Sequence, residues 1–323
     1  MKIIAELCQN HNGSFDLVKS MVDAAAGAGA THVKIQTIYA DTLVFRPQFE
    51  EGLIVDGKTY AIKRPWLPEY QRLKGLELSP DQSFKFVEYC RNVGVIPLTT
   101  CFARKNLKEI YEQGFREIKV ASYDCASYQL IKELAKQFSH LYISTGATFD
   151  DEVECSASIL KNTSASYSFL HCVTLYPTPI EMMHLSRISW LRQHSNQTGF
   201  SDHSFASKDG LVASMAAVLM GAEIIERHFT ILPADETRDG PVSINAKQLK
   251  ELSEFVKLTK TDQRSLLENI YPQWEIMIGN PSRQLTEIEL LNRDYYRGRF
   301  ATPRTQNQNI ATEMIFNWEQ TPI

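Results

Sequence analysis

The chain has 323 residues, of which 43% are hydrophobic and 22% are charged. This composition is typical of a folded enzyme and is too apolar for a disordered chain. With 34 basic and 38 acidic residues the net charge is −4, which argues against a nucleic-acid-binding protein, because such proteins carry a strongly basic face. The length favours either two domains or one large barrel with an appendage.

The first residues and the cysteines together predict a cytoplasmic protein. The opening Met1–Ala5 resembles the start of a secretory signal, but Glu6, Gln9 and Asn10 interrupt its apolar core too early. No apolar run approaches the roughly 20 residues of a membrane helix. Six cysteines are scattered without a Cys-x-x-Cys pair. We therefore expect free thiols in the core of a protein from a reducing compartment.

Short apolar runs recur along the first 230 residues, each followed by an amphipathic stretch. Because these runs are apolar throughout rather than alternating, they predict strands that are buried on both faces of a parallel sheet. The eight runs are Ile3–Leu7, His32–Thr37, Val95–Thr100, Glu117–Ser122, Leu141–Gly146, Tyr167–Val173, Gln197–Asp202 and Glu223–Phe229.

Helix signals lie between these runs. Ser14 is a candidate N-cap for a helix that can stop near Gly27. Ser79 and Gln82 form a capping-box pattern, with proline at the first helical position, and Gly94 can close that helix.

Eight strands that alternate with helices predict an α/β protein with a (β/α)₈ TIM-barrel fold and a short C-terminal extension. The alternative is an open, doubly wound sheet. No Gly-x-Gly-x-x-Gly follows any of the strands, so the usual nucleotide-binding fingerprint of such sheets is missing.

Two regions depart from the alternation. The connection 38–78 is too long for a simple loop, so we expect it to hold small elements and to hang over the active-site face. Residues 283–323 lack clear helix–strand alternation. We therefore predict a catalytic barrel domain over 1–282 and a linker with a partial further domain over 283–323.

Polar residues collect where the predicted strands end, which is where a barrel places its chemistry. These residues, with the polar positions that follow directly, are Glu6, Lys34, Gln36, Thr100, Lys119, Ser122, Asp124, Ser144, Thr174, Tyr176, Ser201, His203, Glu226 and His228.

Lys34 and Lys119 are the most informative of them, because each lies inside an otherwise apolar strand. A buried ammonium group must meet an anion or lose its proton. Two lysines among serine and threonine hydroxyls predict a pocket for phosphate or carboxylate. The alternative is that each lysine forms an ion pair with a neighbouring carboxylate.

His203 and His228 end neighbouring predicted strands, which lie about 4.8 Å apart in a sheet. Their imidazoles can therefore share one metal ion, although two histidines in a core more often only form hydrogen bonds. Imidazole with carboxylate and water suits manganese, iron, cobalt or zinc better than calcium. Glu6 and Glu226 are candidates for further ligands or for substrate contacts.

Asp124, Glu6 and His11 are candidate general acids or bases. For Asp124 the alternative is a helix N-terminal aspartate that interacts with the helix dipole. For Asn10-His11-Asn12-Gly13 the alternative is a turn that precedes the first helix.

The chain resembles the sialic acid synthases, which make N-acetylneuraminic acid and related nonulosonic acids. Seven motifs carry the resemblance in the family's order over residues 3–230. They are Ile4-Ala5-Glu6 with Asn10-His11-Asn12-Gly13, Val33-Lys34-Ile35-Gln36-Thr37, Lys119-Val120-Ala121-Ser122, Ile143-Ser144-Thr145-Gly146, His171-Cys172-Val173-Thr174 with Tyr176-Pro177-Thr178-Pro179, Ser201-Asp202-His203-Ser204 and Glu226-Arg227-His228-Phe229-Thr230.

The resemblance implies a (β/α)₈ barrel that condenses phosphoenolpyruvate with an open-chain aldose, such as N-acetylmannosamine, and releases phosphate. It implies a divalent metal on His203 and His228, with manganese expected and magnesium or cobalt as alternatives. Glu6, Gln36 and Tyr176 would lie beside the sugar or metal. Asp124 stands where the family has a glutamate near the reacting carbons. The implied phosphoenolpyruvate pocket comprises Lys34, Lys119, Ser122, Ser144, Ser201 and Thr100.

Several departures from the family matter. The family's Gly-Pro-Asp after strand eight reads Gly240-Pro241-Val242 here, so its sugar contact is missing or has moved to Asp235 or Asp239. Thr174 replaces a residue that is often Asn or Ser. Residues 293–323 resemble only the opening of the family's antifreeze-like (SAF) domain. We therefore expect altered N-acyl recognition.

The family implies a homodimer that acts on small molecules and binds neither nucleic acid nor membranes. Two other functions stay open. One is a pyruvate aldolase with Lys119 as the Schiff-base nucleophile, and the other is a barrel that binds sugar or phosphate without catalysis.

Overall fold

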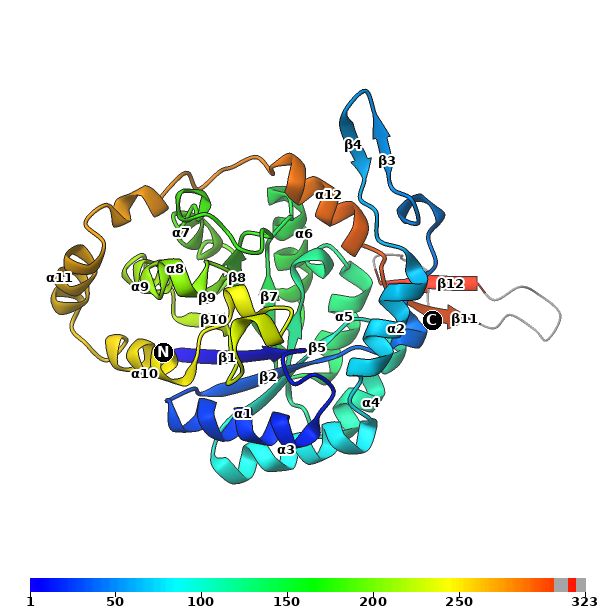
Figure 1. Ribbon diagram of the computed structural model, residues 1–323, viewed down its shortest axis with the longest axis horizontal. Helices are drawn as coiled ribbons and strands as arrows, with labels where there is room; N and C mark the ends of the chain where they lie inside the picture. The colour runs from blue at the N-terminus through cyan, green and yellow to red at the C-terminus, as the bar shows by residue number, and fades with distance from the viewer. Residues whose placement is uncertain (305–312, 318–323) are drawn as a thin grey trace.

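A computed structural model describes residues 1–304 and 313–317 of the chain. Its centre is a closed barrel of eight parallel strands (Figure 1), so the predicted TIM barrel is confirmed. In barrel order the strands are β1 (Lys2–Cys8), β10 (Ile224–His228), β9 (Gln197–Asp202), β8 (Ser166–Cys172), β7 (His140–Ser144), β6 (Glu117–Val120), β5 (Ile96–Cys101) and β2 (His32–Thr37).

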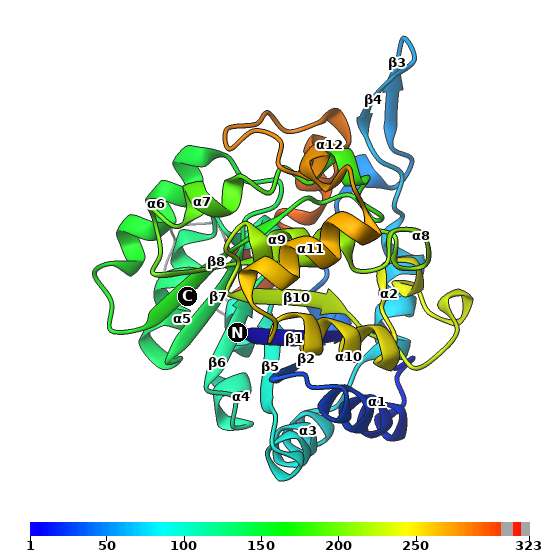
Figure 2. The ribbon, with the colours of Figure 1, turned by 90° about the vertical axis from the view of Figure 1, so that its left-hand side faces the viewer.

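Helices surround the barrel, as Figure 2 shows from the side. They are α1 (Phe15–Gly27), α2 (Trp66–Leu76), α3 (Pro80–Val93), α4 (Leu107–Glu112), α5 (Tyr128–Gln137), α6 (Asp150–Leu160), α7 (Arg187–Leu191), α8 (Ala206–Asp209), α9 (Val212–Leu219), α10 (Ala246–Phe255), α11 (Lys260–Ile270) and α12 (Glu287–Tyr296). None of the helices in the described part of the chain has the length and apolar character needed to cross a bilayer.

The predicted helix caps are present. The Ser14 side chain accepts a hydrogen bond from the Leu17 amide at the start of α1. Ser79 and Gln82 form the reciprocal capping box of α3, and Gly94 ends that helix in the left-handed conformation. These caps satisfy amides and carbonyls that the helix itself leaves without partners.

The barrel interior carries an apolar layer under a polar one. Ile4, Leu98, Tyr142, Leu170 and Ile224 form a separate buried cluster of strand residues. Side chains two positions apart in a strand point to the same face. The residues two positions further along these five strands therefore also face inward, nearer the carboxyl ends. They are Glu6, Thr100, Ser144, Cys172 and Glu226.

The long connection 38–78 holds elements of its own, as predicted. It contains α2 and a hairpin of β3 (Leu53–Val55) and β4 (Lys58–Ala61) that stands away from the barrel (Figure 1). Arg64, Glu69 and Arg72 from this connection line the cavity at the carboxyl ends of the strands. The connection therefore covers the predicted active-site face.

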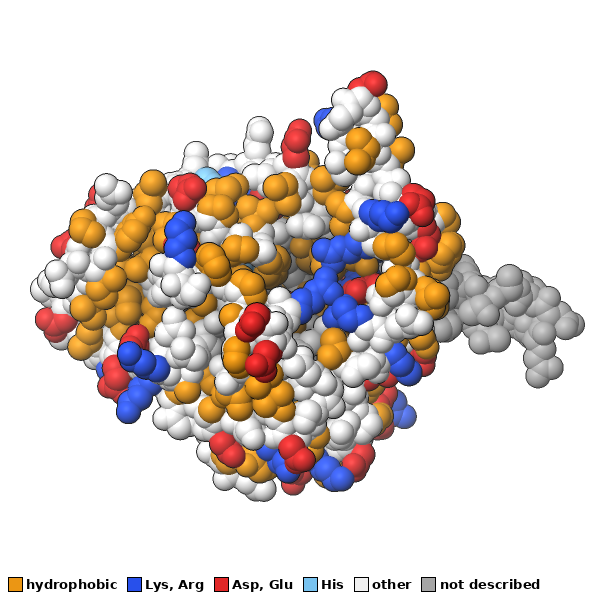
Figure 3. All heavy atoms as spheres, viewed as in Figure 1, with side chains coloured by type: hydrophobic (Ala, Val, Ile, Leu, Met, Phe, Trp, Pro, Cys, Tyr) orange, Lys and Arg blue, Asp and Glu red, His pale blue; other side chains and the backbone are white. Residues whose placement is uncertain are grey.

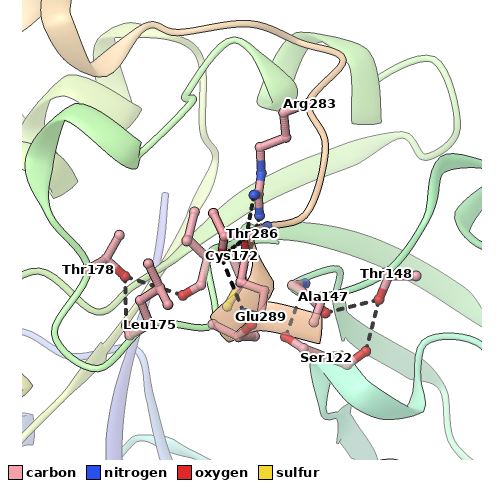
Figure 4. A network of polar contacts seen from close by, with 12 residues as sticks. Ser122, Ala147, Thr148, Cys172, Leu175, Thr178, Arg283, Thr286 and Glu289 are labelled. Atoms are coloured by element: carbon pink, nitrogen blue, oxygen red, sulfur yellow. Dashed lines mark hydrogen bonds and ion pairs between the residues drawn. The ribbon is translucent and has the colours of Figure 1, made fainter. Parts of the chain in front are cut away.

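The segment after 282 contains the helix α12, whose Arg293 donates to the Ala147 carbonyl of the barrel at 2.6 Å. Arg283 forms a buried ion pair with Glu289 of α12, and the Thr286 hydroxyl donates to the same carboxylate (Figure 4). Strands β11 (Ala301–Arg304) and β12 (Glu313–Phe316) follow as an antiparallel pair. The predicted antifreeze-like segment 283–323 extends into residues 305–312 and 318–323, which lie outside the described residues.

Candidate active site

A cavity of about 960 Å³ opens at the carboxyl ends of the barrel strands. Except for Asp124 and Thr174, every strand-end residue predicted for the site lines it, whereas the candidate acid or base His11 does not. Figure 3 shows Lys and Arg side chains gathered at a hollow near the base of the projecting hairpin. The strand-end positions that are far apart in the sequence are therefore brought together in one site.

Lys34 lies at the bottom of the cavity in a network of charges. Its ammonium group forms an ion pair with Glu6, lies 3.8 Å from Glu226, and donates to the Thr100 hydroxyl at 3.1 Å. Burial opposes its charged form, but the two carboxylates outweigh this effect and raise the pKa of Lys34. Lys34 therefore forms the ion pair with a neighbouring carboxylate that was the alternative interpretation. The pair lies inside the predicted pocket.

Lys119 is less tightly paired. Its ammonium group donates to the Ser144 hydroxyl at 2.6 Å and to the Val120 carbonyl at 3.1 Å, while Glu226 lies 3.8 Å away. Burial, and then the nearby charge of Lys34, lower the pKa of Lys119 below its ordinary value. An anion that enters the cavity can therefore gain more from Lys119 than from Lys34.

Hydroxyl and amide side chains surround the two lysines. The Gln36 amide donates to Glu6 at 3.0 Å, and the Ser201 hydroxyl donates to Glu226 at 3.4 Å. The Ser122 hydroxyl accepts from the Gly146 amide at 3.1 Å. These groups supply oriented dipoles around the two ammonium groups, as a site for a small anion requires.

His203 and His228 come from neighbouring strands, and their ring centres lie 5.3 Å apart. Nδ1 of His203 lies 3.2 Å from the Val173 carbonyl, so a hydrogen bond there leaves Nε2 available. Burial, and then the proximity of His228, lower the pKa of His203 to about 3. A neutral imidazole that is fixed through its second nitrogen is the form that binds divalent metals. Tyr176 packs against His203, with ring centres 4.2 Å apart.

Two cysteines were not predicted as site residues. Cys8 and Cys172 are buried, as expected, but they line the cavity rather than the apolar core. Their inward direction follows from the two-residue period of β1 and β8. Asp239 also lines the cavity, whereas Asp235 does not. Asp239 is thus the better placed of the two candidates for the displaced acidic contact.

Asp124 does not line the cavity. Its carboxylate accepts hydrogen bonds from Ser127 at 2.8 Å and from the Asn317 amide at 3.3 Å, an arrangement that favours the helix-start alternative. Thr174 is fully buried outside the cavity lining. His11 is also buried, and its Nδ1 lies within hydrogen-bonding distance of the Gly13 amide, in agreement with the turn alternative.

Arginines from separated segments form the rim of the cavity, which sequence reasoning did not reveal. Glu69 of α2 receives ion pairs from Arg72, Arg238 and Arg299, and Arg64 donates to the Tyr296 hydroxyl. Four guanidinium groups outnumber the carboxylates of Glu69, Asp239 and Glu287, which also line the cavity, and leave a small excess of positive charge. We call these four residues, Arg64, Arg72, Arg238 and Arg299, the arginine rim.

The buried carboxyl of Asp124 predicts a measurable pH dependence of stability. Burial raises its pKa from 3.8 to about 6, so the folded state binds the proton more tightly than the unfolded state. The folded state is therefore destabilised as the pH rises from about 4 to 6, by roughly 3 kcal/mol at most. The substitution Asp124→Asn removes this pH-dependent loss of folding stability.

Urea unfolding of wild type and Asp124→Asn at pH 4.5 and pH 7.5 measures the effect. We expect the variant's advantage in free energy of unfolding to be larger at pH 7.5. The same difference at both pH values would contradict the shifted pKa, because all other titrating groups are common to the two proteins.

Comparisons with known proteins agree with this architecture. The chain is 31% identical over 315 residues to the spore coat polysaccharide biosynthesis protein SpsE of Bacillus subtilis, covering 96% of this chain and 81% of SpsE. It is 28% identical to a pseudaminic acid synthase of Campylobacter jejuni, covering 96% of this chain and 84% of that synthase.

Among solved structures, the N-acetylneuraminic acid synthetase of Leptospira borgpetersenii is 26% identical and superposes with a TM-score of 0.66. The alignment covers 91% of this chain and 90% of that structure. The model of the NeuB family matches residues 21–265, which include most of the cavity-lining strand ends. The chain therefore belongs to the NeuB family.

Proposed function

We propose that this chain joins phosphoenolpyruvate to an open-chain aldose and releases phosphate, which yields a 3-deoxy-2-keto sugar acid. One observation carries the proposal: two buried ammonium groups and two buried imidazoles line the same cavity. The first pair suits a phosphorylated carboxylate, and the second pair suits a divalent cation. The names of the relatives, which include pseudaminic acid and N-acetylneuraminate-9-phosphate synthases, support a reaction of this class.

The lysines would hold phosphoenolpyruvate. Lys119 with Ser144 forms a cationic corner, and Ser122 and Ser201 lie beside it in the lining of the cavity. Charge-assisted hydrogen bonds to phosphate and carboxylate oxygens would fix the enol ester with its carbon 3 free to react. This arrangement contributes to catalysis mainly through positioning and electrostatics.

The reaction then balances as follows. Carbon 3 of phosphoenolpyruvate attacks the aldehyde carbon, and the aldehyde oxygen gains a proton. Water adds at carbon 2, gives up a proton, and phosphate leaves with cleavage of its bond to carbon 2. Because Asp124 faces away from the cavity, Glu226 or Glu6 is the better placed carboxylate to accept the proton from water.

His203 and His228 would hold a divalent metal, with manganese as the first choice. When bound, such an ion acts as a Lewis acid toward the aldehyde oxygen. The residues fit this role because His203 is fixed through its second nitrogen and the buried Nδ1 of His228 has no hydrogen-bond partner among the described residues.

The acceptor sugar would lie between this pocket and the arginine rim. Gln36 can contact its hydroxyl groups from the barrel interior, and α12 places Asn292 and Tyr296 on the opposite wall. Excess positive charge on the rim favours an acceptor with an acidic group far from its aldehyde.

The homodimer and the cytoplasmic location belong to this proposal. The β3–β4 hairpin exposes Leu53, Ile54 and Tyr60, and a second subunit can bury such an apolar surface. All six cysteines lie within the described residues, and each is a free thiol, which agrees with a reducing compartment.

Phosphate release tests the reaction directly. The purified chain is incubated with phosphoenolpyruvate, manganese and a panel of aldoses, with and without N-acyl and phosphate groups. We expect phosphate release with at least one open-chain aldose, fastest with a phosphorylated or carboxylated one, and a product mass equal to the condensation product. No phosphate release with any aldose would exclude the synthase.

Replacing either imidazole tests the metal. His203→Ala and His228→Ala should each lower the manganese bound per chain and reduce turnover more than a hundredfold, because each removes a direct ligand. The partly exposed His194 supplies the matched control, and His194→Ala should keep both metal content and activity. Full metal content in either cavity variant would remove that histidine from the metal site.

Lys119 allows the synthase to be distinguished from a Schiff-base aldolase, which its lowered pKa would suit. Lys119→Met should reduce kcat/KM for phosphoenolpyruvate at least about thirtyfold through loss of a buried charge contact. The exposed Lys19→Met is the control.

Treatment of the wild type with borohydride and pyruvate completes this comparison. We expect no mass increase on Lys119, because the synthase forms no imine. A stable pyruvate adduct on Lys119 would establish the aldolase instead.

A further inference from the structure

Three potential metal ligands from different segments meet at the edge of the cavity. Ligand atoms of Cys8, His228 and Asp239 all lie within 4.8 Å of one another. We propose that these residues form a thiolate-containing site for a divalent metal, with His203 beside it. This inference rests on the proposed function in one respect, because it concerns the same divalent metal that His203 and His228 would hold.

The backbone at Cys8 is bent in a way that suits such a role. Cys8 ends β1 with φ +48°, a left-handed backbone conformation that is uncommon for residues other than glycine. The pairing of β1 with β2 shifts register between Glu6 and Cys8. Strained backbone of this kind is concentrated at functional sites. Here it accompanies a thiol that is 7% exposed and lines the cavity.

His228 provides an independent sign of a ligand-binding position. The residue is 6% exposed, and its Nδ1 has no hydrogen-bond partner among the described residues. The carboxylate of Asp239 is 3.6 Å from that nitrogen, which is too far for a good hydrogen bond. A buried polar atom without a partner is costly, and a metal ion between the two groups would satisfy both.

The loop that carries Asp239 is held in place near Cys8. A side chain at Gly240 would come within 1.8 Å of the Ala234 carbonyl, so the loop is tightly folded there. The Ser243 hydroxyl donates to the Asp239 carbonyl at 2.7 Å. The amide of Asn10, two residues after Cys8, donates to the same Ser243 hydroxyl at 3.0 Å. The two loops are thus cross-linked at the proposed site.

The separations agree with binding around one ion. Thiolate, imidazole and carboxylate ligands lie about 2.0–2.3 Å from zinc, so two ligands of a tetrahedral ion are roughly 3.5 Å apart, close to the 3.6 Å between Nδ1 of His228 and the Asp239 carboxylate. Side-chain movements of up to about 1 Å would bring all three atoms, which lie within 4.8 Å of one another, to such distances. On binding, the Cys8 thiol gives its proton to solvent and coordinates as thiolate.

The donor set also predicts which metals bind well. A thiolate with an imidazole suits zinc, iron or cobalt, whereas magnesium prefers oxygen ligands and water. We therefore expect this chain to prefer cobalt over magnesium more strongly than two histidines with water would.

Cobalt alone serves as the probe, because a thiolate bound to Co²⁺ gives a sulfur-to-metal charge-transfer band in the near ultraviolet. The metal-stripped full chain is titrated with Co²⁺ in the absence of substrates. We expect this band in the wild type and its loss in Cys8→Ser, with cobalt affinity lowered at least about tenfold. Asp239→Asn should keep the band and lower the affinity.

The exposed thiol of Cys155 on α6 provides the matched control. Cys155→Ser should keep both the band and the affinity. Circular dichroism verifies that each variant is folded. If Cys8→Ser does not fold, Asp239→Asn and the wild-type spectrum still decide the matter.

Two outcomes would overturn the inference: a wild-type spectrum without the charge-transfer band, or a band that persists in folded Cys8→Ser. These outcomes are distinct from failure of the proposed function. A cobalt–thiolate band without phosphate release from any aldose would remove the synthase and keep the metal site. Phosphate release without the band would keep the synthase and remove the thiolate-containing metal site.

Discussion

The site depends on placing two ammonium groups inside a closed barrel. Taking a charge out of water costs several kcal/mol unless partners compensate it. Both lysines lie 3.8 Å from Glu226, but Lys34 also forms a close ion pair with Glu6, whereas Lys119 has only a hydroxyl and a carbonyl as further partners. The barrel thus holds one lysine, Lys34, in a close ion pair and a second, Lys119, without a close carboxylate. This imbalance makes the cavity receptive to an anion.

The alternation of side chains along the strands makes this arrangement possible. Each inward residue of the buried cluster is followed two positions later by an inward hydroxyl, thiol or carboxylate side chain, and Ile4 and Ile224 precede the carboxylates Glu6 and Glu226. The apolar layer seals the barrel below, and the carboxyl-end layer can then be polar without exposing the core. A shift of one residue in any strand would turn its charged group toward the surrounding helices.

The same alternation explains what could be predicted from the sequence. Continuous apolar runs define the eight strands, and polar residues at their ends, such as Lys119 and His228, identify the lining of the cavity. The arginine rim, by contrast, combines side chains from α2 and the segment before it, the β10–α10 loop and the segment after α12, so it depends on tertiary packing. Asp124, conversely, was expected in the site but does not line the cavity. It follows a strand directly, but the chain turns there and directs its carboxyl to Ser127. Position after a strand indicates the correct face of the barrel but not the direction of the side chain.

Charge balance links the anion pocket to the metal. Glu6 and Glu226 offset Lys34 and Lys119, while His203 is neutral because burial lowers its pKa. The described core of the site is therefore close to neutral before substrate binds. A phosphoenolpyruvate molecule with two or three negative charges would leave this buried region with an unfavourable excess. A divalent cation a few ångströms away would offset most of it, since electrostatic interactions are strong where water is excluded. Because each ion lowers the cost of burying the other, the proposed metal and the proposed anion are expected to bind cooperatively.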